Sequence, residues 1–486
     1  MPHKLLAFGF SDPCVCNVIP QLASTDEIEK VFWVTDAHGA PTNTESNIKI
    51  IDLNDALFVR PSSSGNGLLN DALFDCYQRT EPIILKMLDR VEKHGPVLSY
   101  DERKNIFHNN FFYWLEFLVS NKISAFVSQD VPHEISDFII AEICQTIFIP
   151  TIAFAQVGTD GVMPISHYKE IGTDSQWVQS TLTRTQETQL KAVFERRLNH
   201  YLAIGKGEPI QLFYTDPAWK NQVLRDTAKR RQQRIKGKIR DSWRKLIKPR
   251  SWRYALYLAI EKPIFRERAF RKLQRQYDEM AVSRPNLEAK YIYLGLHYQP
   301  EMTTSPLGEA FVDQYLIAHF LLSAFPEDVY VYVKEHPNQV SGGRCPDYYE
   351  QFPKSHRIVF INTCVSSHLL QQHCLAVATV VGTVGFEGLW SGKPALIFGN
   401  AYYRKAPGVY HIRRIDDAIA AADIVLNRNS GINTLALTKF LDWLMHRLIP
   451  ANLNSYYVGD SQLSLDPSAN ASVLSTEILA RLESCD

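Results

Sequence analysis

The sequence of 486 residues lacks several features, and each absence excludes a class of protein. No apolar run is long enough to cross a bilayer, which takes about 20 residues in a helix. The eight cysteines form no CxxC pair, and Cys14 and Cys16 have the wrong spacing for a zinc or redox site. The opening MPHKLLAFGF runs straight into a strand-like segment and has no signal-peptide core or cleavage site. We therefore expect a globular protein of the reducing cytoplasm with free thiols.

Metal-binding patterns are missing as well. The fifteen histidines include no HxxxH pair backed by a carboxylate, and no Asp-x-Asp motif stands in a suitable strand-end loop. We therefore expect no metal and no cofactor. Any anionic ligand would then be neutralised by side chains and backbone N–H groups.

The net charge is zero, with 52 basic and 52 acidic residues, but the charges are unevenly distributed. Residues 229–275 contain 18 Lys or Arg against three acids, interleaved with Trp243, Trp252, Tyr254 and Tyr257. Such basic, partly apolar helices suit an anionic membrane surface, which attracts them by about 1 kcal/mol per basic residue. A solvated basic helix and a nucleic-acid surface are the alternatives. Because no nucleic-acid module accompanies the segment, we expect a membrane surface or lipid-linked partner and no nucleic acid.

Short apolar runs alternate with helical segments in two parts of the chain, which is typical of doubly wound parallel sheets. In the first part we expect a helix at 106–119 and strands at 4–10, 31–35, 48–53, 125–128 and 151–155. In the second part we expect strands at 291–296, 329–333, 358–360, 376–381 and 395–398.

The predicted fold class is α/β, with two Rossmann-like domains facing a cleft and a helical basic insertion. We place the first Rossmann-like domain at 1–170, the insertion at 171–288 and the second Rossmann-like domain at 289–430. Residues 431–486 are expected to be C-terminal helices, one of them at 434–448, that pack back on the first domain.

The segment YVYVKEHPN is an apolar strand that stops abruptly at Lys334, Glu335, His336 and Pro337. Pro337 ends the strand and keeps His336 extended rather than helical. Ligands of open α/β sheets bind at the carboxyl ends of the strands, so Lys334 and His336 are placed to meet an anion. The alternative is a histidine that merely caps the next turn.

A second strand end follows at 375–381, where the sequence GTVGFEG begins at Gly382. Gly382 lets the backbone approach a ligand, and Thr383 offers a hydroxyl. The following helix, with Gly385 near its start, points N–H groups at an anion, and Glu387 suits a ribose diol. Ordinary turn chemistry is the alternative, but two such strand ends in one domain favour a nucleotide site.

The loop LHYQPEMTTSPLG at 296–308 precedes a helix expected at Glu309–Ser323. It carries the imidazole of His297, and the hydroxyls of Thr304 and Ser305 could hold phosphate together with the helix start. Helix capping by Thr304 or Ser305 is the alternative. The position beside the other two strand ends favours a nucleotide-binding role for part of this loop.

These motifs, with GKPALIFG at 392–399, resemble the bacterial capsule and surface-polysaccharide biosynthesis proteins. That group has the glycosyltransferase B-type fold and contains transferases of Kdo and related sugars. The His-Pro element is also similar to one in B-fold bacterial sialyltransferases, whose histidine contacts the phosphate of a CMP-sugar. In those enzymes a Ser/Thr-bearing loop before a later helix adds phosphate contacts, and Gly382-Thr383 occupies the matching place. The resemblance covers residues 290–410 well and the first half thinly, through Val131–Glu134.

An inverting transferase needs a base for the acceptor hydroxyl, which should come from the first domain, across the cleft. Asp130, His133 and Glu134 follow the strand expected at 125–128 and are our candidates, with Asp12 as a further one. Asp130 and Glu134 could instead be acids of a helix first turn, stabilised by its dipole. The sialyltransferases use an acidic pair before glycine, whereas Thr159-Asp160-Gly161 has only one acid. A retaining enzyme would need no simple base.

The sequence thus predicts a metal-independent glycosyltransferase of surface-polysaccharide synthesis, peripheral at the inner face of the plasma membrane. The first domain serves the acceptor, a glycan or lipid-linked molecule, and the second binds the nucleotide-sugar donor. The His-Pro element favours a CMP-linked keto-acid sugar over a UDP- or GDP-sugar. Arg404 and Lys405 are weaker candidates for the donor phosphate, because a solvated loop would also explain them. A polyol-phosphate transferase and a non-catalytic scaffold of the export machinery are the alternatives.

Overall fold

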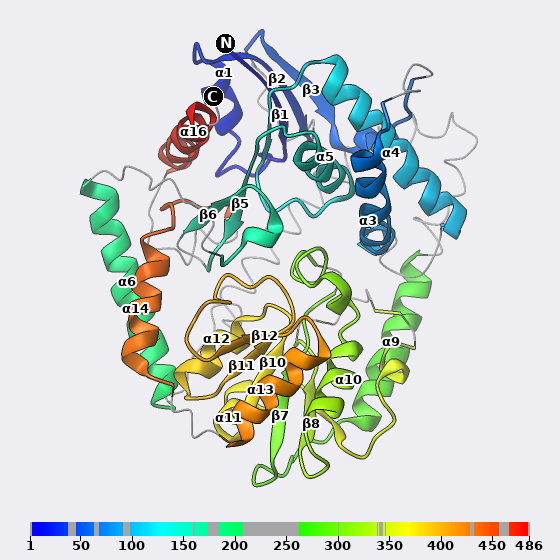
Figure 1. The fold of residues 1–486 in the computed structure, drawn as a ribbon, viewed down its shortest axis with the longest axis vertical. Coiled ribbons are helices and arrows are strands. Elements are labelled where there is room, and N and C mark those ends of the chain that lie inside the picture. Colours follow the sequence, from blue (N-terminus) through cyan, green and yellow to red (C-terminus); the bar gives the residue numbers. More distant parts are fainter. Residues whose placement is uncertain are drawn as a thin grey trace.

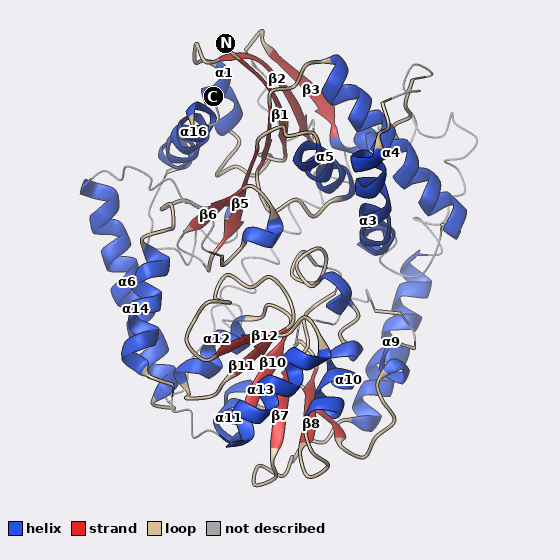
Figure 2. Ribbon diagram, viewed as in Figure 1, coloured by secondary structure: helices blue, strands red, loops and turns tan. Residues whose placement is uncertain are grey.

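Two six-stranded sheets organise the chain, one in each half of the molecule (Figure 1). The computed structural model describes residues 2–36, 45–62, 68–90, 98–158, 161–173, 184–207, 262–299, 301–337, 339, 344–345, 347–427, 432–455 and 466–484. Strands and helices alternate through both halves (Figure 2), which confirms the α/β class predicted from the sequence.

The first sheet has the strand order β3-β2-β1-β4-β5-β6, in which β6 alone is antiparallel to its neighbour. Its strands are β1 (His3–Phe8), β2 (Ile28–Thr35), β3 (Ile48–Asp52), β4 (Ala125–Ser128), β5 (Thr151–Gln156) and β6 (Val162–Ile165). The apolar runs predict the first five. They do not predict β6, because its run is short and contains Pro164, which only an edge strand tolerates.

Helices cover both faces of this sheet. One face carries α3 (Asp71–Met87), α4 (Tyr100–Ser120) and α5 (Ile135–Thr146), beside the short α2 (Leu53–Ala56) and η1 (Leu88–Arg90). The other face carries α1 (Val18–Ala23) and α16 (Pro467–Glu483), which pack against each other. Asn470 of α16 donates a 2.8 Å hydrogen bond to the carbonyl of Cys14. The C-terminal helix α16 therefore packs on the first domain.

The second sheet is parallel throughout, in the order β12-β11-β10-β7-β8-β9. Its strands are β7 (Tyr291–Gly295), β8 (Tyr330–Lys334), β9 (Ile358–Ile361), β10 (Ala376–Thr379), β11 (Ala395–Ile397) and β12 (Val409–His411). This is the Rossmann order, with a switch point between β7 and β10 at which a crevice opens beyond the strand ends. The short, half-buried β12 is not among the predicted strands.

The helices of the second domain are α10 (Tyr315–Ala324), α11 (Ser367–His373), α12 (Thr383–Trp390) and α13 (Ile415–Asn427), with short turns η5 (Glu309–Val312) and η6 (Tyr348–Gln351). The helix expected at Glu309–Ser323 is wrong in its first part. Glu309 has a φ of +47°, which an α-helix does not accommodate, so a 3₁₀ turn precedes α10. Thr304 and Ser305 do not cap α10, since its N-cap residue is Gln314.

Two helices stand before and after residues 208–261. α6 (Arg184–Gly205) packs against α12 and α14 (Thr434–Met445), while α9 (Lys262–Met280) packs against β9. Residues 208–261, with most of the basic segment 229–275, lie outside the described residues. Within the described part of the chain, no helix is long and apolar enough to span a membrane.

Polar contacts join the two domains. Lys86, at the end of α3, forms a 3.1 Å ion pair with Asp313, which lies between β7 and α10. Arg404, after β11, donates a 2.5 Å hydrogen bond to the carbonyl of Lys169 in the turn η2 (Tyr168–Glu170). The loops that follow strands of the second sheet therefore meet the first domain.

Candidate functional site

The switch point of the second sheet brings together the predicted loops after β7 and β10. The backbone N–H of Val381 donates to Nε2 of the buried His297, at 3.1 Å, and Thr379 Oγ1 lies 3.2 Å from the same nitrogen. Burial lowers the pKa of His297 to about 3, so its ring is neutral. Because Nε2 accepts a bond, the proton sits on Nδ1, which is then the nitrogen that could meet a ligand.

Lys334 ends β8 on the sheet face that carries α11. Its Nζ donates a 2.8 Å hydrogen bond to Ser367 Oγ, and the residue is 4% exposed. Burial lowers the pKa of the ammonium to about 8. Among the described residues Lys334 has no carboxylate partner, so a buried positive charge is left without a counterion at the strand end.

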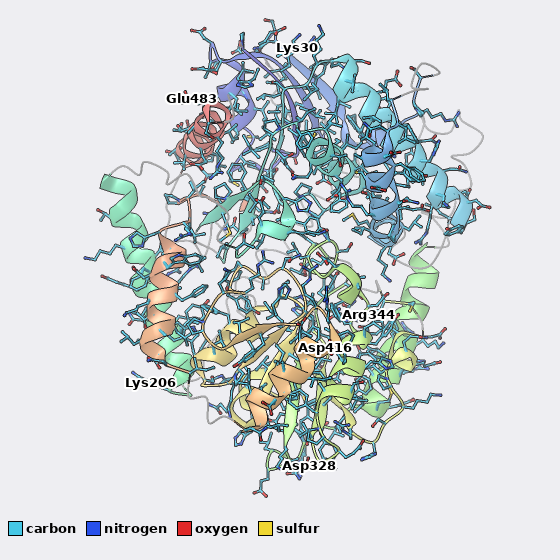
Figure 3. All side chains as sticks on the ribbon, viewed as in Figure 1. Lys30, Lys206, Asp328, Arg344, Asp416 and Glu483 are labelled. Atoms are coloured by element: carbon cyan, nitrogen blue, oxygen red, sulfur yellow. The ribbon has the colours of Figure 1, made fainter. Side chains whose placement is uncertain are left out.

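Glu335 points to the other side and joins a buried ion pair that the sequence did not predict. Arg344, labelled in Figure 3, donates to both carboxylate oxygens of Glu335, at 2.8 and 2.7 Å. Its remaining bonds go to the carbonyl of His297, at 2.7 Å, and to Gln299 Oε1, at 2.9 Å. Tyr349 completes the network with a 2.8 Å bond to Glu335. The pair therefore ties the loop after β7 to the loop after β8.

His336 stands beside this network. Its backbone N–H donates to Glu335 Oε1 at 2.7 Å, and its ring lies edge-on to that of Tyr298, with the centroids 6.2 Å apart. Burial, helped by Arg344 and Lys334 and opposed by Glu335, lowers the pKa of the imidazole. A cavity of about 130 Å³ adjoins His336 and Pro337. The predicted contact of His336 with a phosphate therefore has open space beside it, and it stays a prediction.

The turn before α12 is built from close backbone approaches. The N-cap residue Gly382 provides no side-chain cap, so the first N–H groups of α12 point outward without one. A Cβ on Gly382 would lie 2.8 Å from Thr379 Oγ1 and 3.2 Å from His297 Nε2. One on Gly385 would collide with the hydroxyl of Tyr403, which itself donates to the carbonyl of Gly382. Glycine is therefore required at both positions by packing. The N–H of Gly385 donates to the carbonyl of Gly382 at 3.1 Å, so the N–H groups of Thr383 and Val384 are the ones that an anion could meet.

Three further candidates have partners within the protein. Thr304 is buried and its hydroxyl donates to the carbonyl of Glu301 at 2.9 Å, while Ser305 donates its backbone N–H to the same carbonyl at 3.0 Å. Glu387 is turned toward Thr383 and toward Gln371 Nε2, which is 3.5 Å away, and burial raises the pKa of its carboxyl. Their contacts with phosphate and ribose remain predictions.

The candidate bases lie together at the carboxyl end of β4. Asp130 Oδ1 accepts a 2.7 Å bond from the N–H of Val131, and burial raises the pKa of this carboxyl, although His133 opposes the effect. His133 Nδ1 lies 2.6 Å from the carbonyl of Val131, so Nδ1 carries the proton and Nε2 faces Glu134 at 3.9 Å. Glu134 is the N-cap residue of α5 but makes no side-chain cap bond.

Asp12 has a structural role, because its carboxylate accepts bonds from the N–H groups of Cys14 and Ser455 and from the Ser455 hydroxyl. Thr159 and Asp160 lie outside the described residues. Of the candidates in the first domain, Asp130 combines a strand-end position with a raised carboxyl pKa, which is what a general base requires.

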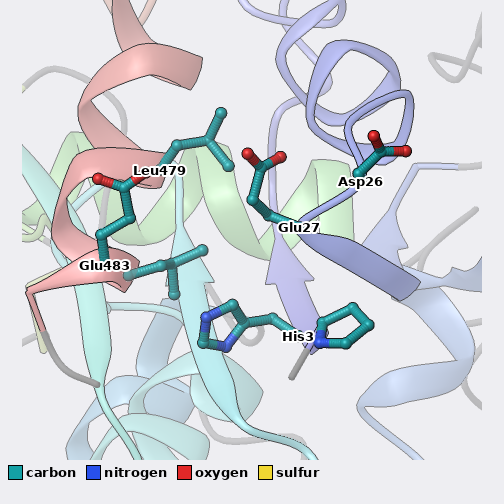
Figure 4. Close-up of a pocket in the computed structure, with 7 residues that line it drawn as sticks. His3, Asp26, Glu27, Leu479 and Glu483 are labelled. Atoms are coloured by element: carbon teal, nitrogen blue, oxygen red, sulfur yellow. The ribbon is translucent and has the colours of Figure 1, made fainter.

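A separate hollow of about 300 Å³ lies where β1 and β2 begin (Figure 4). Its lining includes His3, Asp26, Glu27 and Glu483, and His3 Nδ1 is 3.2 Å from Ser124 Oγ. The described residues contain no cluster of three or more His, Cys, Asp or Glu that could hold a metal. This hollow adjoins the amino ends of the strands, so it belongs to the opposite edge of the sheet from the candidate site.

Two Rossmann-like domains that meet at the carboxyl edge of the second sheet are the architecture of the B-type glycosyltransferases, as predicted. Residues 304–421 match the model of the family described as capsule polysaccharide biosynthesis protein. The match confirms the predicted resemblance over the segment that contains KEHP and GTVGFEG. No curated protein matches the sequence.

Several solved structures are similar to this chain. UDP-GlcNAc 2-epimerase from Methanocaldococcus jannaschii is 10% identical, covers 91% of this chain and 99% of its own, and has a TM-score of 0.25. The glycotransferase of kitacinnamycin is 12% identical, with 99% and 100% covered and a TM-score of 0.24. Thermosulfurimonas dismutans KpsC, a beta Kdo 2,7 transferase, is 11% identical, with 70% and 86% covered and a TM-score of 0.28. TM-scores this low do not establish a shared fold. The B-type architecture follows instead from the strand order of the two sheets.

Proposed function

We propose that the protein is a glycosyltransferase of capsule or other surface-polysaccharide synthesis. It transfers a sugar, a keto-acid sugar carried by CMP, to a glycan or lipid-linked acceptor. The observation that carries the proposal is a buried ammonium without a carboxylate partner at the end of β8, a histidine two residues later, and a helix start beyond the end of β10 at the same edge of the sheet. These groups belong to Lys334, His336 and α12.

Lys334, His336 and the start of α12 suit a sugar nucleotide, because the leaving group of such a donor is a phosphate. A cation in a desolvated position interacts with an anion more strongly than an exposed one does. The backbone N–H groups at the start of α12 add uncharged donors that favour the same anion. Together they would stabilise the charge that develops on the departing nucleotide without a metal ion.

The acceptor side of the proposal rests on Asp130. A carboxyl whose pKa is raised by burial is a better proton acceptor at neutral pH than an exposed one. In an inverting reaction Asp130 would take the proton of the acceptor hydroxyl as the sugar–phosphate bond breaks. His133 and Glu134 stand in the same loop and are the next candidates.

A thermal-shift panel with CMP, CDP, UDP, GDP and ADP tests the donor. A ligand at 100 times its dissociation constant stabilises its protein by about 2.7 kcal/mol, and we expect CMP to give the largest shift. His336→Ala should reduce the shift by about half or more, whereas His319→Ala, on the exposed side of α10, should keep it. A preference for UDP or GDP would replace the proposed donor, and turnover of a CDP-polyol would favour a polyol-phosphate transferase. Absence of any shift would favour a scaffold.

Location at the inner membrane face is proposed from the charge of residues 229–275. Binding to anionic vesicles should fall steeply with salt, because surface attraction is screened beyond roughly 8–10 Å at physiological ionic strength. It should be lost, with nucleotide affinity unchanged, when five basic residues are neutralised together: Arg230, Arg231, Arg234, Lys236 and Lys238. Wild-type protein that ignores such vesicles at low salt would refute the membrane contact.

A further inference from the structure

The loop after β11 carries a cation that has only neutral partners. Arg404 is half-buried, and its guanidinium donates to Asn400 Oδ1 at 2.9 Å and to the carbonyl of Lys169 at 2.5 Å. No ion pair of Arg404 occurs among the described residues. A guanidinium has five N–H donors, so three remain for another group. The contact with Lys169 places this cation at the junction of the two domains.

Two carboxylates, those of Glu309 and Asp417, lie near Arg404 and His411, and neither forms an ion pair with Arg404. Arg413 forms an ion pair with Glu309 at 3.4 Å, and its side chain is 63% exposed. The charge of Glu309 also raises the pKa of Arg404, against the larger effect of burial. Burial and the charge of Arg413 lower the pKa of Arg404. Burial, Arg404 and Arg413 lower the pKa of His411 to about 4, so its ring is neutral. Glu309 pairs with Arg413, and Asp417 accepts the backbone N–H groups of Arg413 and Arg414, so among the described residues Arg404 is left without a carboxylate partner.

The cluster of Arg404, Arg413 and His411 adjoins the turn at Gly382 before α12 but is distinct from it. Tyr403, next to Arg404 in the chain, donates its hydroxyl to the carbonyl of Gly382. The loop that carries Arg404 is therefore fixed to the turn before α12. Because β11 is the neighbour of β10, the cluster lies one strand away from the switch point, on the side opposite to β8.

We propose that Arg404 and Arg413 form an acceptor subsite that binds an anionic group, a phosphate or a carboxylate, on the molecule that receives the sugar. The proposal rests on the proposed function and names its acceptor class. The donor phosphate already has Lys334, His336 and the start of α12, whereas a second anion would require a second set of donors. Planar guanidinium groups bind phosphate and carboxylate in a bidentate manner, which also fixes the orientation of an acceptor.

The test measures anion binding by thermal shift in the presence and absence of saturating CMP. Inorganic phosphate and glucuronate are titrated separately against chloride at equal ionic strength, so the two arms distinguish a phosphate-bearing from a carboxylate-bearing acceptor. We expect one of them to stabilise the wild type beyond the effect of CMP. Arg404→Gln and Arg413→Gln should each weaken this binding by about tenfold or more, the loss of one charge-assisted bond, and leave the CMP response intact.

Arg414→Gln is the matched control, because this neighbouring arginine is exposed and should change neither response. The ion pair of Arg413 is with Glu309 of the same domain, so its variant leaves the bond between Arg404 and Lys169 at the domain junction in place. Wild-type anion affinity in Arg404→Gln and Arg413→Gln would overturn the subsite. Loss of the CMP response in either would overturn it too, because the cluster would then serve the donor. If no nucleotide stabilises the wild type, the proposed function fails and the acceptor assignment with it. A thermal shift with phosphate or glucuronate that is lost in Arg404→Gln and Arg413→Gln would still show that these two arginines bind an anion.

Discussion

The buried pair Glu335–Arg344 gives the sharpest test of how the site is held. Their side chains are 5% and 1% exposed, and Arg344 makes four hydrogen bonds to Glu335, His297 and Gln299. Glu335→Gln removes the negative charge and leaves the guanidinium buried without a counterion. Breaking a buried pair in this way costs about 3–5 kcal/mol. For a domain of this size that corresponds to a fall in unfolding temperature of roughly 6–20 °C.

Differential scanning calorimetry would measure this loss in the unfolding transition of the second domain. Asp328→Asn is the matched control, because its ion pair with Lys290 has the same 2.7 Å length but is exposed to solvent. Solvent and salt screen such a pair, so the control should change the transition very little. An unchanged transition in Glu335→Gln would refute the view that this pair holds the two loops together.

A double variant separates stability from positioning. Replacing Glu335 and Arg344 together by methionine removes both charges, and well-packed apolar replacements of buried pairs are often neutral or stabilising. We expect the double variant to regain most of the lost stability. The nucleotide affinity of the double variant should nevertheless be lower than that of the wild type, because the N–H of His336 and the carbonyl of His297 lose their partners. Full recovery of nucleotide affinity would show that the pair contributes stability alone.

Three further predictions concern the donor site. His336→Ala should leave the fold intact and weaken nucleotide binding roughly 10- to 150-fold in calorimetric titration, the effect of one hydrogen bond to a charged group; wild-type affinity would remove His336 from the site. Gly385→Val should displace Tyr403 and lower both stability and nucleotide affinity, and a crystal structure showing Tyr403 unmoved would contradict this reason. Lys334 must be protonated to meet phosphate, and its pKa in the free protein is about 8. Nucleotide affinity should therefore be constant below pH 8 and fall above it, whereas a flat profile to pH 10 would exclude Lys334.

Much of the fold follows from local pattern. The predicted strands of both sheets are confirmed because each is an apolar, β-branched run bounded by turn residues, and parallel strands are buried on both faces. The strands β6 and β12 were not predicted in this way, because β6 contains Pro164 and β12 is a half-buried VYH segment without an apolar run. The expected helix from Glu309 failed because a positive φ at that residue has no sequence signal when the residue is not glycine.

The candidate site was predictable as a set of strand ends and unpredictable as a set of contacts. Arg344 stands nine residues after Glu335 and 47 after His297, and nothing in the sequence indicates that it reaches both. The ribose contact of Glu387 stays a prediction, and its carboxyl is turned toward Gln371. Side-chain direction within a helix depends on the neighbouring helix, which the local sequence does not specify.

The KEHP motif shows why the two levels must be combined. Lys334 and Glu335 are adjacent and opposite in charge, and the sequence does not show where the charge of Glu335 goes. Successive residues of a strand point to opposite faces, and the structure shows Lys334 against Ser367 and Glu335 against Arg344. The carboxylate is thus taken by the guanidinium, and the ammonium is left buried without a counterion. The proposed contact of Lys334 with an anionic ligand requires this separation, because a lysine already paired with its neighbour would have to break that pair first.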